Sequence, residues 1–179
     1  MDTDADTVAP RDTRSLREAL GSFVSGVTVI TCAEDSSRPV GVTVSSFCSL
    51  SLEPPMVLWC LARNARSTEA FLAAPFFAAN VLAHDQWHVA EKFATRGADK
   101  FGAIDWDASN NGVPLLQGCA ARFECLRNRV YEGGDHLIVT GLIQEFSVTD
   151  KAPLAYHRGR YALTHRDEEA AQLMAWQSW

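Results

Sequence analysis

Three strand-like segments follow one another near the end of the chain, and a turn-sized link joins the first two. They span residues 121–132, 135–149 and 160–164, and they alternate apolar with polar side chains. Gly133 and Gly134 separate the first two segments and predict a hairpin turn. Strands joined this closely favour an antiparallel barrel over a doubly wound parallel sheet.

The rest of the sequence adds further strands and short helices. Apolar and β-branched residues predict strands at 26–34, 41–51, 56–62 and 76–82. A helix is predicted after Ser15 as N-cap, with an apolar stripe formed by Leu16, Leu20, Phe23 and Val24. Two more helices are predicted at 67–74 and 84–94. The expected fold is therefore mainly β, an antiparallel barrel with a few short flanking helices.

Length and charge limit the possible classes of protein. A chain of 179 residues fits one domain, expected at 14–165, with a disordered tail at 1–13 and a helical tail at 166–179. The net charge of −6 argues against a nucleic-acid surface. There is no apolar run of about 20 residues and no basic, apolar leader at the start, so we expect a cytoplasmic protein without a membrane span.

The common catalytic and metal motifs are missing from the sequence. Five cysteines, an odd number without a CxxC pair, are expected to be buried free thiols: Cys32, Cys48, Cys60, Cys119 and Cys125. His84 and His88 would share one helix face, but no HExxH pattern or third ligand accompanies them, so no metal site is expected. The sequence also has no GxSxG elbow and no GxGxxG turn, so no catalytic nucleophile and no Rossmann site are expected.

Three polar segments are candidate binding sites, and each has a purely structural alternative. The strand predicted at 41–51 carries hydroxyls on one face, which suit a flat polar heterocycle or a phosphate but also a solvated surface. The segment 131–136 places a histidine after a glycine turn, where it could bind a nucleotide or simply be exposed. The segment 156–161 offers arginines and tyrosines, which suit phosphates and aromatic rings but also an edge strand.

Taken in order, six segments resemble the short-chain flavin reductases, the NAD(P)H:flavin oxidoreductase components of two-component flavin monooxygenases. They are SGVTVIT, GVTVSSFCSLSLEPPMVLWCLA, ST, KFA, YEGGDHLIVTGLI and GRY, and the likeness covers residues 14–164. The resemblance implies a flavin-binding split β-barrel, usually a homodimer with its sites near the subunit interface.

The resemblance also implies roles for individual residues. The flavin ring and ribityl chain would lie against Thr43, Val44, Ser45 and Ser46, with Cys60, Leu61 and Ala62 at the pyrimidine end of the ring. Ser67 and Thr68 would meet the flavin phosphate, and Phe93 and Lys100 match a further flavin-contacting region. The reduced nicotinamide nucleotide would meet Ser25, Gly26, His136, Arg160 and Tyr161.

The implied reaction is hydride transfer from NADH to FAD, or FMN, with no catalytic side chain and no metal. Reduced flavin would pass to a partner monooxygenase that oxidises aromatic compounds. Two alternatives share the split barrel: a corrinoid reductase, and a flavin- or haem-binding module without turnover.

Overall fold

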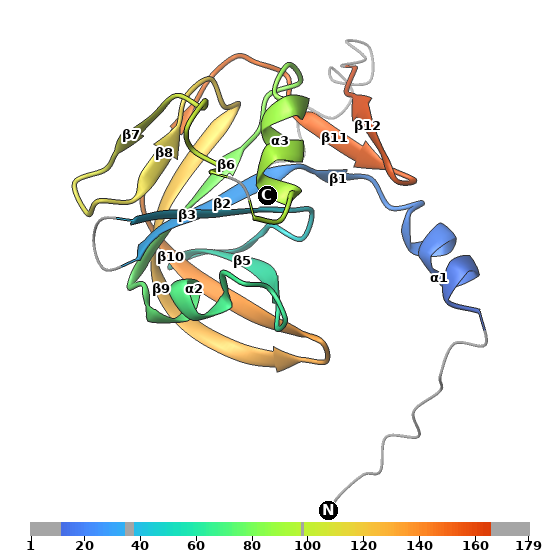
Figure 1. Ribbon diagram of the computed structural model, residues 1–179, viewed down its shortest axis with the longest axis horizontal. Coiled ribbons are helices and arrows are strands. Elements are labelled where there is room, and N and C mark those ends of the chain that lie inside the picture. Colours follow the sequence, from blue (N-terminus) through green and yellow to red (C-terminus); the bar gives the residue numbers. More distant parts are fainter. Residues whose placement is uncertain (1–11, 35–37, 98, 166–179) are drawn as a thin grey trace, which may run out of the picture.

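The computed structural model describes residues 12–34, 38–97 and 99–165. In this part of the chain a curved antiparallel sheet forms the body, and two small sheets and three short helices lie around it (Figure 1). None of the helices in these ranges is long and apolar enough to cross a membrane. The mainly β fold predicted from the sequence is confirmed. The predicted tail at 166–179 and most of the tail at 1–13 lie outside the described residues.

The main sheet has seven strands in the order β3-β2-β6-β9-β10-β5-β4. These strands are β2 (Thr28–Glu34), β3 (Arg38–Val44), β4 (Cys48–Leu52), β5 (Pro55–Ala62), β6 (Phe76–Val81), β9 (Ala121–Gly133) and β10 (His136–Val148). The small sheets are formed by β1 (Ser25–Gly26), β11 (Leu154–His157) and β12 (Arg160–Leu163), and by β7 (Trp106–Ala108) and β8 (Pro114–Leu116). The helices are α1 (Thr13–Leu20), α2 (Thr68–Ala73) and α3 (Trp87–Ala94).

The two edge strands of the main sheet are consecutive in the chain, and this closes the sheet into a barrel. In a flat sheet of seven strands, β3 and β4 would lie about 29 Å apart, at roughly 4.8 Å per strand spacing. They are joined only by residues 45–47, a link that reaches at most about 14 Å when fully extended. The sheet must therefore curl until its edges approach each other. The two edges do not pair within the described residues, so the barrel is split.

The single strand predicted at 41–51 is wrong: the chain crosses from one edge of the sheet to the other within it. β3 ends at Val44 and β4 begins at Cys48. The crossing segment is anchored on β5, where the backbone N–H of Cys60 donates to Ser46 Oγ at 2.9 Å. A run of small hydroxyl residues therefore marks a crossover here, and it does not form a solvated strand face.

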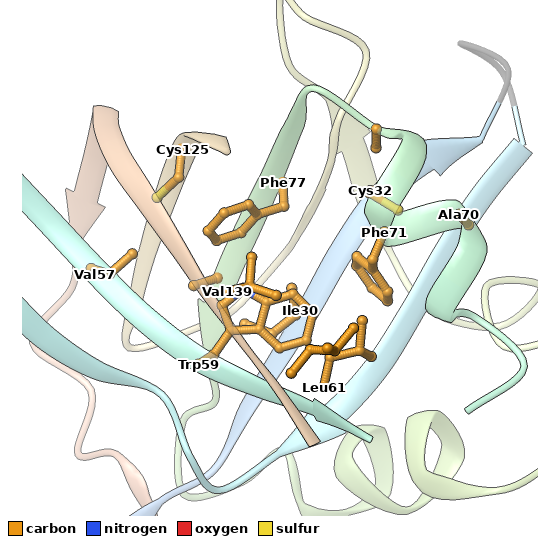
Figure 2. Close-up of a cluster of buried hydrophobic side chains, with 13 residues drawn as sticks. Ile30, Cys32, Val57, Trp59, Leu61, Ala70, Phe71, Phe77, Cys125 and Val139 are labelled. Carbon is orange, nitrogen blue, oxygen red and sulfur yellow. The ribbon is translucent and has the colours of Figure 1, made fainter. Parts of the chain in front are cut away.

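β2 lies at the centre of the fold and is buried on both sides. Ile30 and Cys32 pack into the barrel interior, where the Trp59 ring lies 5.1 Å from the Phe71 ring (Figure 2). The other face of the sheet packs against α3, β8 and β11 through a second apolar cluster. That cluster contains Val27, Val29, Leu82, Val89, Ala90, Phe93, Phe101, Leu116, Cys119 and Leu154. Five successive residues of β2, from Thr28 to Cys32, are therefore buried.

Asn80 connects three strands within the second layer. Its side chain is completely buried, and its Nδ2 donates to Val29 O at 3.0 Å and to Thr31 Oγ1 at 3.1 Å. Its Oδ1 accepts from the backbone N–H of Leu116 at 2.9 Å. A buried amide with all these partners fixes the position of β8 on β2 and β6.

The first helix differs from its prediction in its cap and in its packing. Asp12 is the N-cap and accepts from Arg14 N, whereas Ser15 was predicted to cap. The apolar stripe does not pack on the described chain, because Leu20 and Phe23 are 67% and 79% exposed. The predicted stripe also runs past the helix, because α1 ends at Leu20 and leaves Phe23 and Val24 beyond it.

Two further predictions need correction. Cys48 is exposed and Cys60 is half-buried, so only Cys32, Cys119 and Cys125 are buried free thiols. Both exceptions lie in or beside the crossing region, where side chains of β4 and β5 point out of the barrel. His84 precedes α3, so it does not form a helical pair with His88. The described residues contain no cluster of metal-ligating side chains.

Candidate functional site

A cleft of about 740 Å³ opens between β3, the loop from β5 into α2, and the end of α3. Its lining residues fall within the ranges 38–42, 62–70 and 93–101, together with Glu34. Four of the predicted flavin residues line it: Ala62, Ser67, Phe93 and Lys100. Thr68 begins α2 outside this lining. The other predicted flavin residues lie in or near the crossing segment, which continues from β3.

One wall of the cleft depends on a close approach between Gly41 and Phe93. A Cβ on Gly41 would lie 2.4 Å from Phe93 Cε1, so no side chain fits at residue 41. Lys100 fixes the same wall, since its Nζ donates to Gly41 O at 3.2 Å and to Phe93 O at 2.7 Å. Desolvation lowers the pKa of Lys100 from its ordinary value of 10.5. These contacts hold α3 and the following loop against β3.

Most polar side chains predicted to meet the flavin already bond within the chain. Thr43 Oγ1 donates to Ala90 O at 2.7 Å, and Thr68 Oγ1 donates to Ala62 O at 3.0 Å. Ser46 is bonded to the Cys60 backbone. The exposed Ser45 and the half-buried Ser67 have no such hydroxyl bond within the described residues, and Ser67 occupies the N-cap position of α2 without a side-chain capping bond. Two hydroxyls of the predicted set are therefore free for a ligand.

Two predicted residues turn their side chains toward the barrel interior. Leu61 is 1% exposed and belongs to the barrel core, and Val44 packs against the same core from β3. A ligand on the outer side of these strands could meet only their backbone groups. The alternation along β3 explains this, because Gly41 and Thr43 point to the opposite side, toward α3.

His136 lies beside the segment of β5 that resembles a flavin site. It opens β10 directly opposite Ala62 in the paired strands. Its Nδ1 is 2.7 Å from Asp135 Oδ1, and this hydrogen bond lowers the pKa of Asp135. The backbone N–H of Arg63 donates to Asp135 O at 3.0 Å, which ties the hairpin turn to the start of the β5–α2 loop.

The other four predicted nicotinamide residues gather in the three-stranded sheet. Ser25 and Gly26 form β1 and pair with Tyr156 and Ala155 of β11. Arg160 and Tyr161 lie on β12, where the Tyr161 ring lies 5.7 Å from the Tyr156 ring. Burial is the main cause that raises the pKa of Tyr161. His136 belongs to the main sheet, so the predicted nicotinamide residues form two groups.

The structure adds basic residues that the sequence analysis did not select. Arg66 and Arg96 are exposed, line the cleft, and have no ion pair within the described residues. A second cavity of about 650 Å³ lies between α1 and the β11–β12 turn, where Arg17 and Arg158 contribute to the lining. The only sequence signal was the position of Arg66 and Arg96 next to predicted helix ends, which does not distinguish them from other surface arginines.

A split antiparallel barrel with a polar crossing segment and a neighbouring cationic cleft is the architecture expected of a flavin-binding reductase. The chain matches the flavin reductase like domain over residues 20–165, and it belongs to this family. The predicted resemblance to flavin reductases is thereby confirmed.

Several relatives carry this domain. The reductase subunit of a flavin-dependent monooxygenase from Rhodococcus jostii is 41% identical, over 84% of this chain and 77% of its own length. An FMN reductase (NADH) from Agrobacterium fabrum is 41% identical, over 84% of this chain and 85% of its own. The NADH:FAD oxidoreductase of Streptomyces globisporus, solved with NAD and FAD fragments, superposes with a TM-score of 0.84 at 37% identity, covering 92% of this chain and 99% of its own.

Some relatives are considerably longer than the aligned region. The chain spans 65% and 48% of the length of two curated relatives from Rhizobium meliloti, which are 44% and 41% identical to it.

Proposed function

We propose that the chain is an NADH-dependent flavin reductase of the cytoplasm that reduces FAD, or FMN, for a partner monooxygenase acting on aromatic compounds. One observation carries this proposal: the crossing segment continues directly from β3, which forms a wall of the cleft. His136 lies beside the same cleft, opposite Ala62. The family match and the relatives named as NADH-dependent flavin reductases support it.

The residues of the site fit a flavin. A bound flavin supplies the hydride acceptor, so no nucleophile or metal ligand is required of the protein. The backbone of residues 43–47 and 60–62 would hold the ring, with the Ser45 hydroxyl available to bond it. Thr43, Ser46 and Lys100 would mainly hold the neighbouring segments of the site in place, because their polar atoms bond within the chain. The Ser67 hydroxyl, which lines the cleft, would be available to bond the flavin phosphate.

His136 and the small sheet would receive the nicotinamide nucleotide. The imidazole lies at the edge of the proposed ring site and is oriented by Asp135. Ser25, Gly26, Arg160 and Tyr161 offer a second set of contacts on the other sheet. Holding the two rings in contact and excluding water would provide the rate enhancement through orientation.

The exposed apolar surface supports a homodimer. Phe146 and Val148 are 73% and 74% exposed at the end of β10, and the Phe146 ring stacks on Phe123 at 6.3 Å. Leu20 at the end of α1 and Phe23 beyond it are further exposed apolar side chains. Exposed apolar side chains that gather in patches are typical of protein–protein contact sites.

The test is to mix the purified protein with NADH and excess FAD or FMN and to follow the nicotinamide absorbance. Flavin-dependent NADH oxidation is expected, and its absence with both flavins would reject the proposal. Cofactor retained without NADH oxidation would indicate a binding module, and turnover of a cobalt corrinoid with little flavin turnover would indicate a corrinoid reductase. His136→Ala should raise the KM for NADH more than the KM for flavin.

The hydroxyl contact can be tested with a matched pair of variants. Ser45→Ala should weaken flavin binding without changing the thermal midpoint, because its hydroxyl bonds nothing in the described chain. Ser46→Ala should lower the thermal midpoint as well, because it removes the acceptor for Cys60 N–H.

A further inference from the structure

We infer that Arg66 and Arg96 bind the diphosphate of FAD and make this site favour the dinucleotide flavin over FMN. The inference rests on the proposed flavin reductase function, and it adds the residues that select between the two flavins.

Both walls of the cleft lead away from the proposed ring site, and one of them ends at Arg66. β3 runs from Thr43 back to Arg38, and at about 3.3 Å per residue Arg38 lies roughly 13 Å beyond Val42. On the facing wall the chain runs from Cys60 through Ala62 to Arg66. A flavin with its ring on the crossing segment would therefore extend its phosphate end along the cleft.

The two arginines come from different walls and approach each other. Arg66 lies in the loop that joins β5 to α2, and Arg96 follows α3. A Cβ on Gly97 would lie 3.8 Å from Arg66 Nη1, so the Arg66 guanidinium reaches the segment that carries Arg96. Gly97 has a φ of 86°, which turns this segment at the mouth of the cleft. Two guanidinium groups at the same opening of the cleft can each pair with one of two linked phosphates.

Of the other charged side chains that line the cleft, all but Glu69, in the first turn of α2, already bond within the chain. Arg38 pairs with Glu34, and the Lys100 ammonium donates to two carbonyls. Asp99 accepts from the backbone N–H groups of Phe101 and Gly102. Within the described lining, Arg66 and Arg96 are therefore the cations left free for a ligand. FMN has one phosphate, which Ser67 and one arginine could satisfy, whereas FAD has two.

The experiment compares direct binding of FAD and FMN to the wild type, Arg66→Gln, Arg96→Gln and the double variant, by flavin fluorescence quenching. Loss of one charge-assisted contact is expected to weaken FAD binding about tenfold per arginine. FMN binding should change by less than about threefold in at least one single variant. Arg122→Gln is the control, because Arg122 bonds Ser147 on the surface and does not line the cleft.

Equal losses for FAD and FMN in both single variants would overturn the inference, and so would unchanged FAD binding in the double variant. Either result leaves the proposed function intact as long as both flavins still support NADH oxidation. Circular dichroism melts of each variant show whether a loss of binding reflects unfolding, and Arg66→Lys and Arg96→Lys should restore part of the FAD affinity.

Discussion

The ring of Phe93 lies directly on the backbone of Gly41, so close that a Cβ at residue 41 would be 2.4 Å from Phe93 Cε1. Gly41→Ala must therefore displace the ring, which is fully buried in the second apolar cluster. We expect a loss of about 1–3 kcal/mol of folding stability, together with weaker flavin binding because the cleft wall moves. Urea unfolding and flavin titration measure the two effects.

Gly26→Ala is the matched control for stability, because nothing lies within 4 Å of a Cβ at that position. A Gly41→Ala protein as stable as Gly26→Ala would contradict the close approach.

The buried amide of Asn80 holds three strands together. Asn80→Ala would leave the N–H of Leu116 and the carbonyl of Val29 without this partner. We expect a loss of about 3 kcal/mol, since each buried group left unpaired costs about 1–3 kcal/mol. The exposed Asn128→Ala should stay within about 0.5 kcal/mol of wild type. Chemical denaturation of both variants measures the difference, and similar values would argue against the network.

Lys100 should make stability depend on pH in the alkaline range. Its pKa in the folded protein is lowered by desolvation from 10.5, so just below pH 10.5 the unfolded chain binds more protons. The stability of wild type relative to Lys100→Met should therefore rise as the pH rises through the folded pKa toward 10.5. Unfolding curves for both proteins at several pH values test this. If the stability of wild type relative to Lys100→Met fell as the pH rose, the prediction would be contradicted.

The five thiols should react in a fixed order. Burial raises the pKa of Cys32 to about 12, of Cys119 to about 11 and of Cys125 to about 12, which keeps these thiols protonated and inaccessible. Cys48 is exposed, and we expect iodoacetamide to alkylate it first in the folded protein. Peptide mapping by mass spectrometry at timed intervals gives the order. Early labelling at Cys125 would contradict the packing, and Cys48→Ser should remove the fast phase.

The apolar end of β10 should control assembly. Phe146→Glu places a charge where a dimer would bury an aromatic ring, so we expect the variant to be monomeric while the wild type is dimeric. Light scattering after size-exclusion chromatography gives the masses. Tyr131→Glu, also on an exposed side chain of the same hairpin, tests whether any charge on β9–β10 has this effect. A monomeric wild type would remove the support for a dimer.

Local patterns were sufficient for the strands that carry clear periodicity. The hairpin of β9 and β10 was predicted almost to its ends, because long alternating strands flank a Gly-Gly turn. β5 and β6 were also predicted, since their apolar runs end at proline or helix signals. In contrast, β1, β7 and β8 have only two or three residues, too few for a period to be visible. β11 was missed although it is as long as the predicted β12.

Other features depend on contacts that no local pattern encodes. The alternation of Val and Ser continues through residues 41–51, so the crossing at 45–47 looks like one strand, and only the pairing of β3 and β4 with different neighbours reveals it. Residues that bind within the chain, such as Thr43 and Lys100, look identical in sequence to residues free for a ligand. Arg66 and Arg96 come together only because α3 folds back over β3.

The link between β3 and β4 has only three residues, 45–47, and it lies at the proposed ring site. If residues 45–47 both hold the two edges of the barrel together and contact the flavin ring, each bound flavin stabilises the closed barrel. Saturating flavin should then protect the fold by RT ln(1 + [L]/Kd), about 2.7 kcal/mol at a hundredfold excess over Kd. Without flavin, the barrel should open first between β3 and β4. Faster amide hydrogen exchange at residues 45–47 would detect this opening.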